Sequence, residues 1–247
     1  MPTEAPRDEV RVRQATSADM AAVAELYIST RKAAVPAMPA PVHDEDSVRK
    51  WVAGLGERYE LWVAETDQVI GFAALSAGWL EDLYVGPLHQ GSGVGSMLLD
   101  LVKMQRPAGF GLWVFASNHS ARGFYRRHGL VELEHTDGSG NEERSPDVHM
   151  AWPGRDPVSF FRTQIDAVDD DLAVVLARRL ALSTAVQDYK EPSGRPGRDP
   201  EREIEIIQRM ARHVPGLGGE LISRVMDTVI AESLAAWEAR RDGVGGS

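Results

Sequence analysis

Cysteine is absent from the 247 residues of this chain. Its absence excludes disulfides, thiolate metal sites and a cysteine nucleophile, and it favours a reducing compartment. Long apolar runs are also missing, since no stretch approaches the roughly 20 apolar residues that a membrane-spanning helix needs. The N-terminal segment MPTEAPRDEV is polar and acidic, unlike a secretory signal peptide. We therefore expect a cytoplasmic protein with no membrane partner.

A basic excess is missing as well. The formal net charge is −10 at pH 7, and acidic residues outnumber basic ones on both sides of residue 154. A nucleic-acid-binding protein would carry a positive surface, so we expect no nucleic-acid partner. Arginine is frequent in the C-terminal part. Any anion bound there must be held by a local cluster of arginines rather than by the field of the whole chain.

The character of the sequence changes near residue 154. Before it, short apolar runs bounded by Gly and Pro alternate with helical stretches, which predicts an α/β domain over residues 1–154. After it no comparable strand pattern follows, and we predict an all-α domain over residues 155–247. The runs interpreted as strands are Leu61–Glu65, Val69–Leu75, Leu80–Val85 and Gly111–Ala116.

Three helices are predicted in the C-terminal part. Phe160–Lys190 contains neither Gly nor Pro, and its apolar residues recur at helical spacing. A loop is predicted over Glu191–Asp199. Asp199 is a suitable N-cap, and Pro200 suits the first position of a second helix. After a segment rich in Pro and Gly, a third helix is expected to run to about Arg240.

A glycine-rich turn follows the predicted strand Leu80–Val85. The run Gln90-Gly91-Ser92-Gly93-Val94-Gly95 opens a helix whose apolar residues lie three or four positions apart. Glycines let a ligand approach the backbone closely, and a helix N-terminus directs free N–H groups at an anion. The pattern is typical of a pyrophosphate-binding turn, but a tight turn without function has the same composition.

A second segment supports the functional interpretation. After the next predicted strand comes Asn118-His119-Ser120-Ala121-Arg122-Gly123-Phe124-Tyr125. Together with the glycine-rich run, it resembles the signature of the GNAT acyltransferase family, in the family's order and spacing. The resemblance covers about Arg11 to Ala151. It implies a mixed central sheet flanked by helices, acetyl-CoA or another acyl-CoA as cosubstrate, and an amine as acceptor.

The resemblance also implies roles for individual residues. Backbone groups of Leu83 and Val85 would pair with the pantetheine arm of CoA, and Asn118 would contact the same arm. Tyr125 would protonate the leaving thiolate, and Glu81 is a candidate base for the amine. The pyrophosphate would be held by backbone amides of Gln90, Gly91, Ser92, Gly93, Val94, Gly95 and Ser96.

Structural interpretations of the same side chains stay open. Tyr125 could pack in the core, and Glu81 could be a solvated strand residue. His149, in the last strand of this domain, is more often structural than catalytic.

Charged residues recur at regular places on the three C-terminal helices. The first carries Arg162, Arg179 and Lys190, the second starts at Asp199-Pro200-Glu201-Arg202-Glu203, and the third carries Ser233. The pattern resembles the all-helical, type II chorismate mutase family, without a gap from Arg162 to Glu203. It implies an intertwined homodimer of three-helix chains that converts chorismate to prephenate, a step of the shikimate pathway in aromatic amino acid biosynthesis.

This reaction is an intramolecular rearrangement, which needs no nucleophile, metal or proton transfer. It needs the substrate held in its reactive conformation and charge balanced on the breaking ether bond. On the family's pattern, Arg162 and Arg179 would hold carboxylates, which the planar guanidinium binds through two hydrogen bonds. Lys190 would contact one carboxylate and the ether oxygen.

The second helix would complete the site. Glu203 and the backbone near Arg202 would bind the ring hydroxyl, and Asp199 would orient its neighbours or cap the helix. Any one of these charges alone would be interpreted as part of a solvated helix face. Their occurrence together in one register favours the site.

Helix geometry adds an expectation about assembly. Arg162 and Arg179 are 17 residues apart, which is about 25 Å along a helix axis. One small substrate cannot contact both in one chain. We therefore expect Arg162 to reach the site of another subunit in a homodimer.

One residue departs from the family's pattern. Four residues after Ser233, where the family has Gln or Glu beside the ether oxygen, this chain has Trp237. The indole N–H could donate a hydrogen bond, or the ring could simply pack. Rearrangement of 4-amino-4-deoxychorismate and pyruvate elimination from isochorismate are therefore alternative reactions.

Two further interpretations assign a different role to a whole domain. The helical part could be a non-catalytic module that dimerises an acyltransferase or senses a metabolite, which Trp237 favours. The acyltransferase part could instead be degenerate, against which the intact glycine-rich turn and Tyr125 argue.

Overall fold

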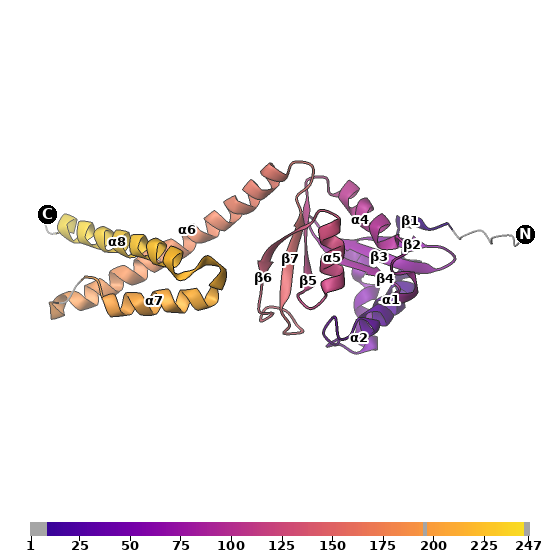
Figure 1. The fold of residues 1–247 in the computed structure, drawn as a ribbon, viewed down its shortest axis with the longest axis horizontal. Helices are drawn as coiled ribbons and strands as arrows, with labels where there is room; N and C mark the ends of the chain where they lie inside the picture. Colours follow the sequence, from indigo (N-terminus) through magenta and orange to yellow (C-terminus); the bar gives the residue numbers. More distant parts are fainter. Residues whose placement is uncertain (1–8, 195–196, 245–247) are drawn as a thin grey trace, which may run out of the picture. The chain divides into compact units, whose positions relative to one another are not determined.

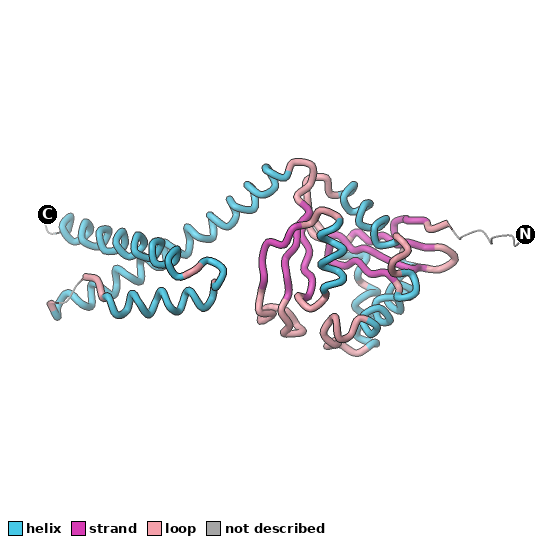
Figure 2. Tube along the Cα trace, viewed as in Figure 1, coloured by secondary structure: helices cyan, strands magenta, loops and turns pink. Residues whose placement is uncertain are grey.

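The structure is a computed structural model, and it describes residues 9–194 and 197–244. The chain forms two compact units that divide between Thr163 and Gln164. The first unit combines strands and helices, whereas the described residues of the second form helices and turns only (Figures 1 and 2). This confirms the prediction of an α/β part followed by an all-α part. The junction of the two functional domains after Gly154 stays a prediction.

The elements of the first unit include every strand predicted from the sequence, to within one residue at each end. Its strands are β1 (Arg11–Gln14), β2 (Glu60–Glu65), β3 (Val69–Leu75), β4 (Leu80–Val85), β5 (Phe110–Phe115), β6 (Val131–His135) and β7 (Asp147–Trp152). Its helices are α1 (Met20–Ala33), α2 (Glu45–Ala53), α3 (Leu55–Arg58), α4 (Val94–Gln105) and α5 (His119–Arg127), and α6 (Pro157–Lys190) continues into the second unit.

The strands form two antiparallel sheets, in the orders β1-β2-β3-β4 and β5-β7-β6. A single parallel bridge joins them, between Trp79 just before β4 and Gly111 of β5. The two sheets are therefore joined at one parallel bridge, and β4 and β5 are held together at one end only.

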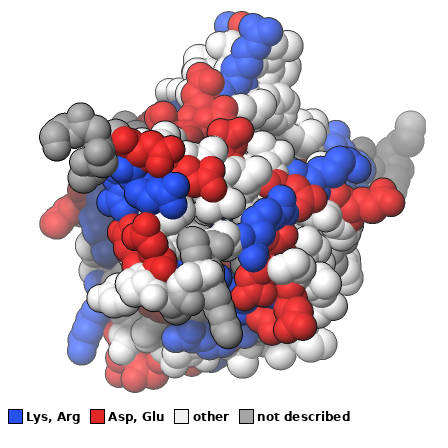
Figure 3. Space-filling model, turned by 90° about the vertical axis from the view of Figure 1, so that its left-hand side faces the viewer, with Lys and Arg blue, Asp and Glu red and all other residues white. Residues whose placement is uncertain are grey.

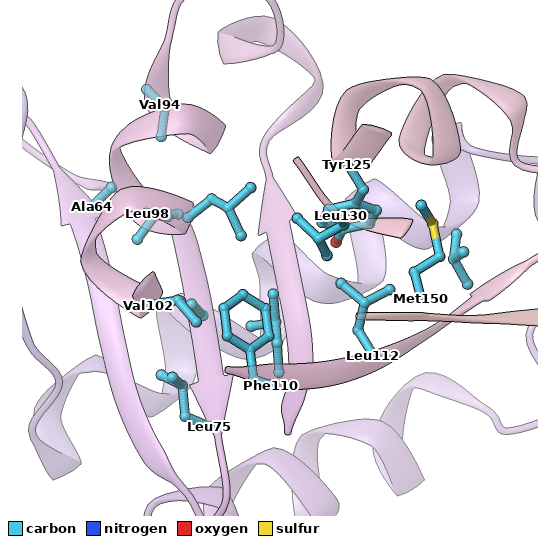
Figure 4. Close-up of a cluster of buried hydrophobic side chains, with 14 of the residues drawn as sticks. Ala64, Leu75, Val94, Leu98, Val102, Phe110, Leu112, Tyr125, Leu130 and Met150 are labelled. Atoms are coloured by element: carbon cyan, nitrogen blue, oxygen red, sulfur yellow. The ribbon is translucent and has the colours of Figure 1, made fainter. Parts of the chain in front are cut away.

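Hydrophobic cores cover both faces of the first sheet. The segment β3 is an almost continuous apolar run because both of its faces are buried. Ile70 and Leu75 belong to the core that includes α4, and Phe72 belongs to the core that includes α1 and α2. Figure 4 shows the first of these cores, in which Leu98 and Val102 of α4 lie over the strands.

The second unit consists of the rest of α6, α7 (Pro200–His213) and α8 (Gly219–Val244). As predicted, Asp199 caps α7 by accepting a hydrogen bond from the backbone N–H of Arg202 over 3.1 Å. Short 3-10 turns precede α7 and α8, at Glu191–Ser193 and Pro215–Leu217. The described apolar side chains that are fully buried in this unit are few: Ile222, Met226 and Trp237 of α8.

A matched pair of glycines tests how tightly the connection between β6 and β7 is packed. Gly129 and Gly138 both have left-handed φ angles, +82° and +78°. A side chain at Gly129 would meet open space, but at Gly138 it would lie 2.2 Å from the backbone of Ser145. We expect Gly129→Ala to cost about 1–2 kcal/mol of unfolding free energy from backbone strain alone. Gly138→Ala should cost about 1–3 kcal/mol more because the backbone must also move. Urea unfolding measures both, and equal costs would contradict the packing.

Candidate functional site

The edge of β4 that faces β5 carries backbone groups of Leu83 and Val85 that pair with no described strand. Beyond the bridge at Trp79, no strand among the described residues pairs with this edge. The N–H of Gly86 donates to the C=O of Ile70 over 2.9 Å, while Val85 lies opposite Gly71. In an antiparallel ladder this register turns the amide groups of Leu83 and Val85 away from β3. These are the groups that were predicted to pair with pantetheine.

The glycine-rich turn lies directly after this edge. Gln90 donates its side-chain amide to the C=O of Val85 over 3.1 Å. Gly91 and Gly93 have φ angles of +77° and +97°, and a side chain at either would point into open space. Gly93 is the N-cap of α4, whose first turn has no acidic residue. The free N–H groups there, of Val94, Gly95 and Ser96, belong to the stretch predicted to hold a pyrophosphate.

Helix α5 packs beside this turn. Its N-cap is Asn118, whose side chain accepts a hydrogen bond from the N–H of Ala121 over 3.1 Å. Tyr125 is buried, and Figure 4 shows its ring beside Leu130 and Leu112. Burial raises the pKa of the Tyr125 phenol, with a smaller contribution from the Asp82 carboxylate. The phenol is therefore protonated at neutral pH and suits the role of a proton donor.

Two neighbouring carboxylates on β4 occupy different environments. Glu81 is exposed and accepts a hydrogen bond from Ser76 Oγ over 2.6 Å. Asp82 is half-buried, and its pKa is raised to about 7, chiefly by burial and secondarily by the Glu81 carboxylate. Asp82 lies opposite Ala74 and Tyr84 opposite Phe72, so both side chains are on the face covered by α1.

The sequence analysis named Glu81 as the candidate base and did not single out Asp82. The alternation of side chains between the two faces of β4 contains a signal for Asp82. If Leu83 and Val85 line one face, then Asp82 and Tyr84 must line the other. The irregular pairing beside Leu75 then leaves Glu81 at the surface.

His149 has a structural environment. Its ring stacks between Trp79 and Trp113, with centroids 5.1 Å from each. Burial lowers the pKa of His149. The arrangement agrees with the structural interpretation of this residue.

In the second unit, Arg179 and Ser233, two of the site residues expected from the sequence, lie in contact. Arg179 Nη1 donates to Ser233 Oγ over 3.2 Å, and Ser233 Oγ donates to the C=O of Val229 over 2.6 Å. The hydroxyl therefore holds the guanidinium at the interface of α6 and α8. Lys190 ends α6, three helical turns beyond Arg179, and its side chain is partly buried.

Glu203 is held by an arginine that the sequence analysis did not single out. Arg198 binds both carboxylate oxygens of Glu203, over 2.8 and 2.6 Å, and also reaches Asp227 over 3.0 Å. The Arg198 guanidinium lowers the pKa of Glu203. Arg202 instead pairs with Glu205 over 2.7 Å. Glu203 is therefore an ionised acceptor at the start of α7.

The loop before α7 is anchored from α6. Gln187 is buried, its amide nitrogen donates to the C=O of Gly197 over 3.1 Å, and its oxygen accepts from the N–H of Gly197 over 2.8 Å. This clamp places Arg198 next to α6, and it explains a buried glutamine that the family pattern did not predict.

Trp237 is buried, with 2% of its surface exposed. Its indole N–H donates to Asp188 Oδ1 over 2.7 Å, and Arg240 holds both oxygens of the same carboxylate. The indole N–H of Trp237 is therefore occupied by a carboxylate of α6. This geometry favours packing over donation to a substrate.

Arg162 does not join this group. Its side chain is exposed, and it lies in the first compact unit, whereas Arg179 lies in the second. The two are 17 residues apart on the continuous helix α6, about 25 Å along its axis.

Charges of both signs are mixed on one face of the molecule. The face in Figure 3 shows Lys and Arg interspersed with Asp and Glu among uncharged residues. Within residues 9–194 and 197–244, no group of three His, Asp or Glu side chains could hold a metal ion. The same residues include no helix with the length and apolarity needed to cross a bilayer.

Comparison with known proteins finds both predicted families. Residues 57–132 match the family model described as an acetyltransferase (GNAT) domain. Residues 161–237 match the model described as chorismate mutase type II. These matches confirm the two resemblances inferred from the sequence.

Individual relatives each match part of the chain. The T-protein of Haemophilus influenzae is 36% identical over 76 residues, which are 30% of this chain and 20% of that protein. YjaB of Escherichia coli has a similar fold, with a TM-score of 0.50 and 20% identity over 59% of this chain and 99% of its own. The ribosomal-protein-S18-alanine N-acetyltransferase of Escherichia coli aligns over 59% of this chain and 94% of its own, with 20% identity and a TM-score of 0.47.

Proposed function

We propose that this chain, which contains a GNAT acetyltransferase domain and a type II chorismate mutase domain, is a bifunctional enzyme. One activity transfers an acyl group from acyl-CoA to an amine, and the other rearranges chorismate to prephenate. The free edge of β4 beside an open glycine-rich turn supports the first activity. The meeting of Arg179 and Ser233 supports the second. A chain without cysteine suits the cytosol, where we expect both to operate.

Acyl-CoA would bind along the free edge of β4. Its pantetheine amides would pair with the outward backbone groups of Leu83 and Val85, as an added strand does. Its pyrophosphate would lie at the N-terminus of α4, where positive dipole and free N–H groups meet. The absence of side chains at Gly91 and Gly93 leaves the approach open.

A matched pair of substitutions tests this binding mode. Gly93→Glu would put a carboxylate at the N-terminus of α4, where it competes with the pyrophosphate. Gly129→Glu is the control, because Gly129 also has a left-handed φ and open space around it. We expect acetyl-CoA affinity, measured by calorimetry, to fall at least about 100-fold in the first variant, which corresponds to about 2.7 kcal/mol. It should change little in the control. Equal affinities in two folded variants would contradict the proposal.

Asp82 is the base that we favour for acyl transfer. The amine nitrogen attacks the thioester carbon, the C–S bond breaks, the amine proton passes to Asp82, and Tyr125 protonates the thiolate. A pKa of about 7 suits a base at neutral pH. Burial keeps the Tyr125 phenol protonated until it donates its proton to the thiolate.

The pH dependence of acyl transfer distinguishes Asp82 from Glu81. The base must be ionised, so the wild-type rate should rise as pH increases through about 7, the pKa of Asp82. Asp82→Asn should lose this rise and about 10²–10⁴ in rate, the typical contribution of a general base. Glu81→Gln removes the neighbouring carboxylate, which should lower the pKa of Asp82 and shift the rise to lower pH. A rise that persists in Asp82→Asn and disappears in Glu81→Gln would assign the base to Glu81.

The mutase site would use one cation for each negative group of chorismate. Arg179, positioned by Ser233, would bind one carboxylate. Lys190 would contact a carboxylate and the ether oxygen that gains charge as its bond breaks. Glu203, held ionised by Arg198, would accept a hydrogen bond from the ring hydroxyl. Arg162 of another chain would bind the second carboxylate.

The surface of α6 supports a homodimer. Ile165, Val168, Leu172 and Val175 are spaced three or four residues apart, and each exposes at least half of its surface. Such a stripe on one side of a helix is costly in water. A second copy of α6 would cover it and would bring Arg162 of one chain towards Arg179 of the other.

Mixed chains test whether the sites are shared. Arg162→Ala and Arg179→Ala chains should each be inactive towards chorismate as pure proteins. After unfolding and refolding as a mixture, hybrid dimers carry one site with both arginines intact. We expect about one quarter of the wild-type activity, the fraction expected when half of the chains pair as hybrids with one intact site each. If the chains are shown to exchange but activity is not recovered, the result would contradict sites that are shared between two chains.

Trp237 favours a second candidate for this domain. The family's Gln or Glu would contact the ether oxygen from this position, but Trp237 is buried and bonded to Asp188. A ring with an amino group, as in 4-amino-4-deoxychorismate, would place an ammonium against the ionised Glu203. Turnover of that compound, or of isochorismate, in preference to chorismate would support these alternatives. Binding of chorismate without turnover would favour a sensing or dimerising module.

A further inference from the structure

A hollow of about 280 Å³ lies beside α1 in the first unit. Tyr27, Ile28 and Arg31 of α1 line one side of it, and Val48 of α2 lines another. Tyr27 packs edge-on against Tyr84 of β4, with ring centroids 5.0 Å apart. The hollow therefore adjoins the sheet face that carries Asp82.

Arg31 is an unusual residue to line such a hollow, because it is a buried cation with 3% of its surface exposed. Its guanidinium lies over the ring of Phe115, at the end of β5. Nη2 donates to Glu143 over 2.7 Å, whereas among the described residues Nη1 meets only the sulfur of Met38 over 3.7 Å. Nε is buried, and the described residues offer it no acceptor.

Guanidinium carries five N–H donors, and thioether sulfur is a weak acceptor. Arg31 is therefore only partly satisfied by the protein. Leaving donors of a charged group unpaired in a buried place is costly. A carboxylate answers this need best, because its two oxygens match adjacent donors of the guanidinium fork.

The other charged side chains around the hollow are already used. Lys32 pairs with Glu45, and Asp44 caps α2 by accepting from the N–H of Ser47 over 2.7 Å. His43 lies 2.8 Å from Glu142 in the connection between β6 and β7. Among the residues lining the hollow, Arg31 is thus the buried cation with donors left for a ligand.

We propose that this hollow binds the acyl acceptor, and that the acceptor is a small amine bearing a carboxylate, which Arg31 recognises. The inference rests on the proposed acyltransferase activity and specifies its substrate class. The volume is at the lower end for small-ligand pockets, about 300 Å³, which suits an amino acid better than a protein chain. Tyr27, Ile28 and Val48 favour an apolar or aromatic body.

The two ends of such an acceptor have separate partners. Arg31 projects from α1 and Asp82 from β4, on the same face of the sheet, and their charges interact. With the carboxylate on Arg31, the amine would be directed towards Asp82 and the free edge of β4, where the acyl group is expected.

Matched acid and amide acceptors test the proposal. The full chain is given acetyl-CoA with L-phenylalanine, L-phenylalaninamide, L-leucine or L-leucinamide, and thiol release is followed. We expect kcat/KM to be about 10- to 100-fold higher for each acid than for its amide, as for gaining a hydrogen bond to a charged group. Because the amide's amine is less basic, the acid-to-amide ratio is compared between variants rather than interpreted alone.

The informative variant removes the cation without leaving its partner unpaired. Arg31→Met combined with Glu143→Gln should bring the acid-to-amide ratio down by the same 10- to 100-fold. Glu143→Gln alone and Lys32→Met should keep it. An unchanged ratio in the folded double variant, or a wild-type preference for amides, would overturn the inference.

Two further outcomes separate this inference from the activity on which it rests. If acetyl-CoA binds but none of the four amines is acetylated, the acceptor class proposed here is wrong while CoA binding stands. If acetyl-CoA itself does not bind, the acyltransferase proposal fails.

Discussion

The rise of an α-helix, 1.5 Å per residue, is the constraint on which the C-terminal half depends. It separates Arg162 from Arg179 by about 25 Å, although the pattern requires both at one small dicarboxylate. The same length leaves α6, with 34 residues, more apolar surface than α7 and α8 cover. A second copy of the helix would meet both requirements, because it would bury the stripe and supply the missing arginine. Assembly and catalysis would then be a single property of this domain.

In the N-terminal half, the corresponding constraint is that backbone groups must find partners. The strands β4 and β5 are joined only at Trp79 and Gly111, so no described strand pairs with the outward backbone groups of Leu83 and Val85. The glycine-rich turn continues this edge into the N-terminus of α4. Asp82 and Arg31 lie on the face of the sheet that α1 covers, which is opposite to the face that α4 covers. The proposed cosubstrate and the proposed acceptor would therefore reach the reaction from two sides of one strand.

Much of this arrangement was predictable from the sequence, because local patterns determine it. The strands β2 to β5 and the capped helix α7 follow from apolar runs and from Asp199-Pro200. The residues that were missed depend on tertiary contacts. Asp82 is distinguished from Glu81 by burial. Arg198 gains its role from the Gln187 clamp on Gly197. Trp237 was singled out from the sequence, but its contact with Asp188 could only be seen in the structure. The strand β6 carries exposed apolar residues such as Leu133, so its alternation is weak.

The dependence of mutase activity on assembly tests the central claim most directly. The full chain is diluted through the concentration at which sedimentation shows it dissociating, and chorismate loss is followed at each step by the disappearance of its diene absorbance. We expect activity per chain to fall in parallel with the dimer fraction, because the Arg162 of a monomer cannot reach a substrate held by its own Arg179 and Lys190. A monomer with full activity per chain would contradict it.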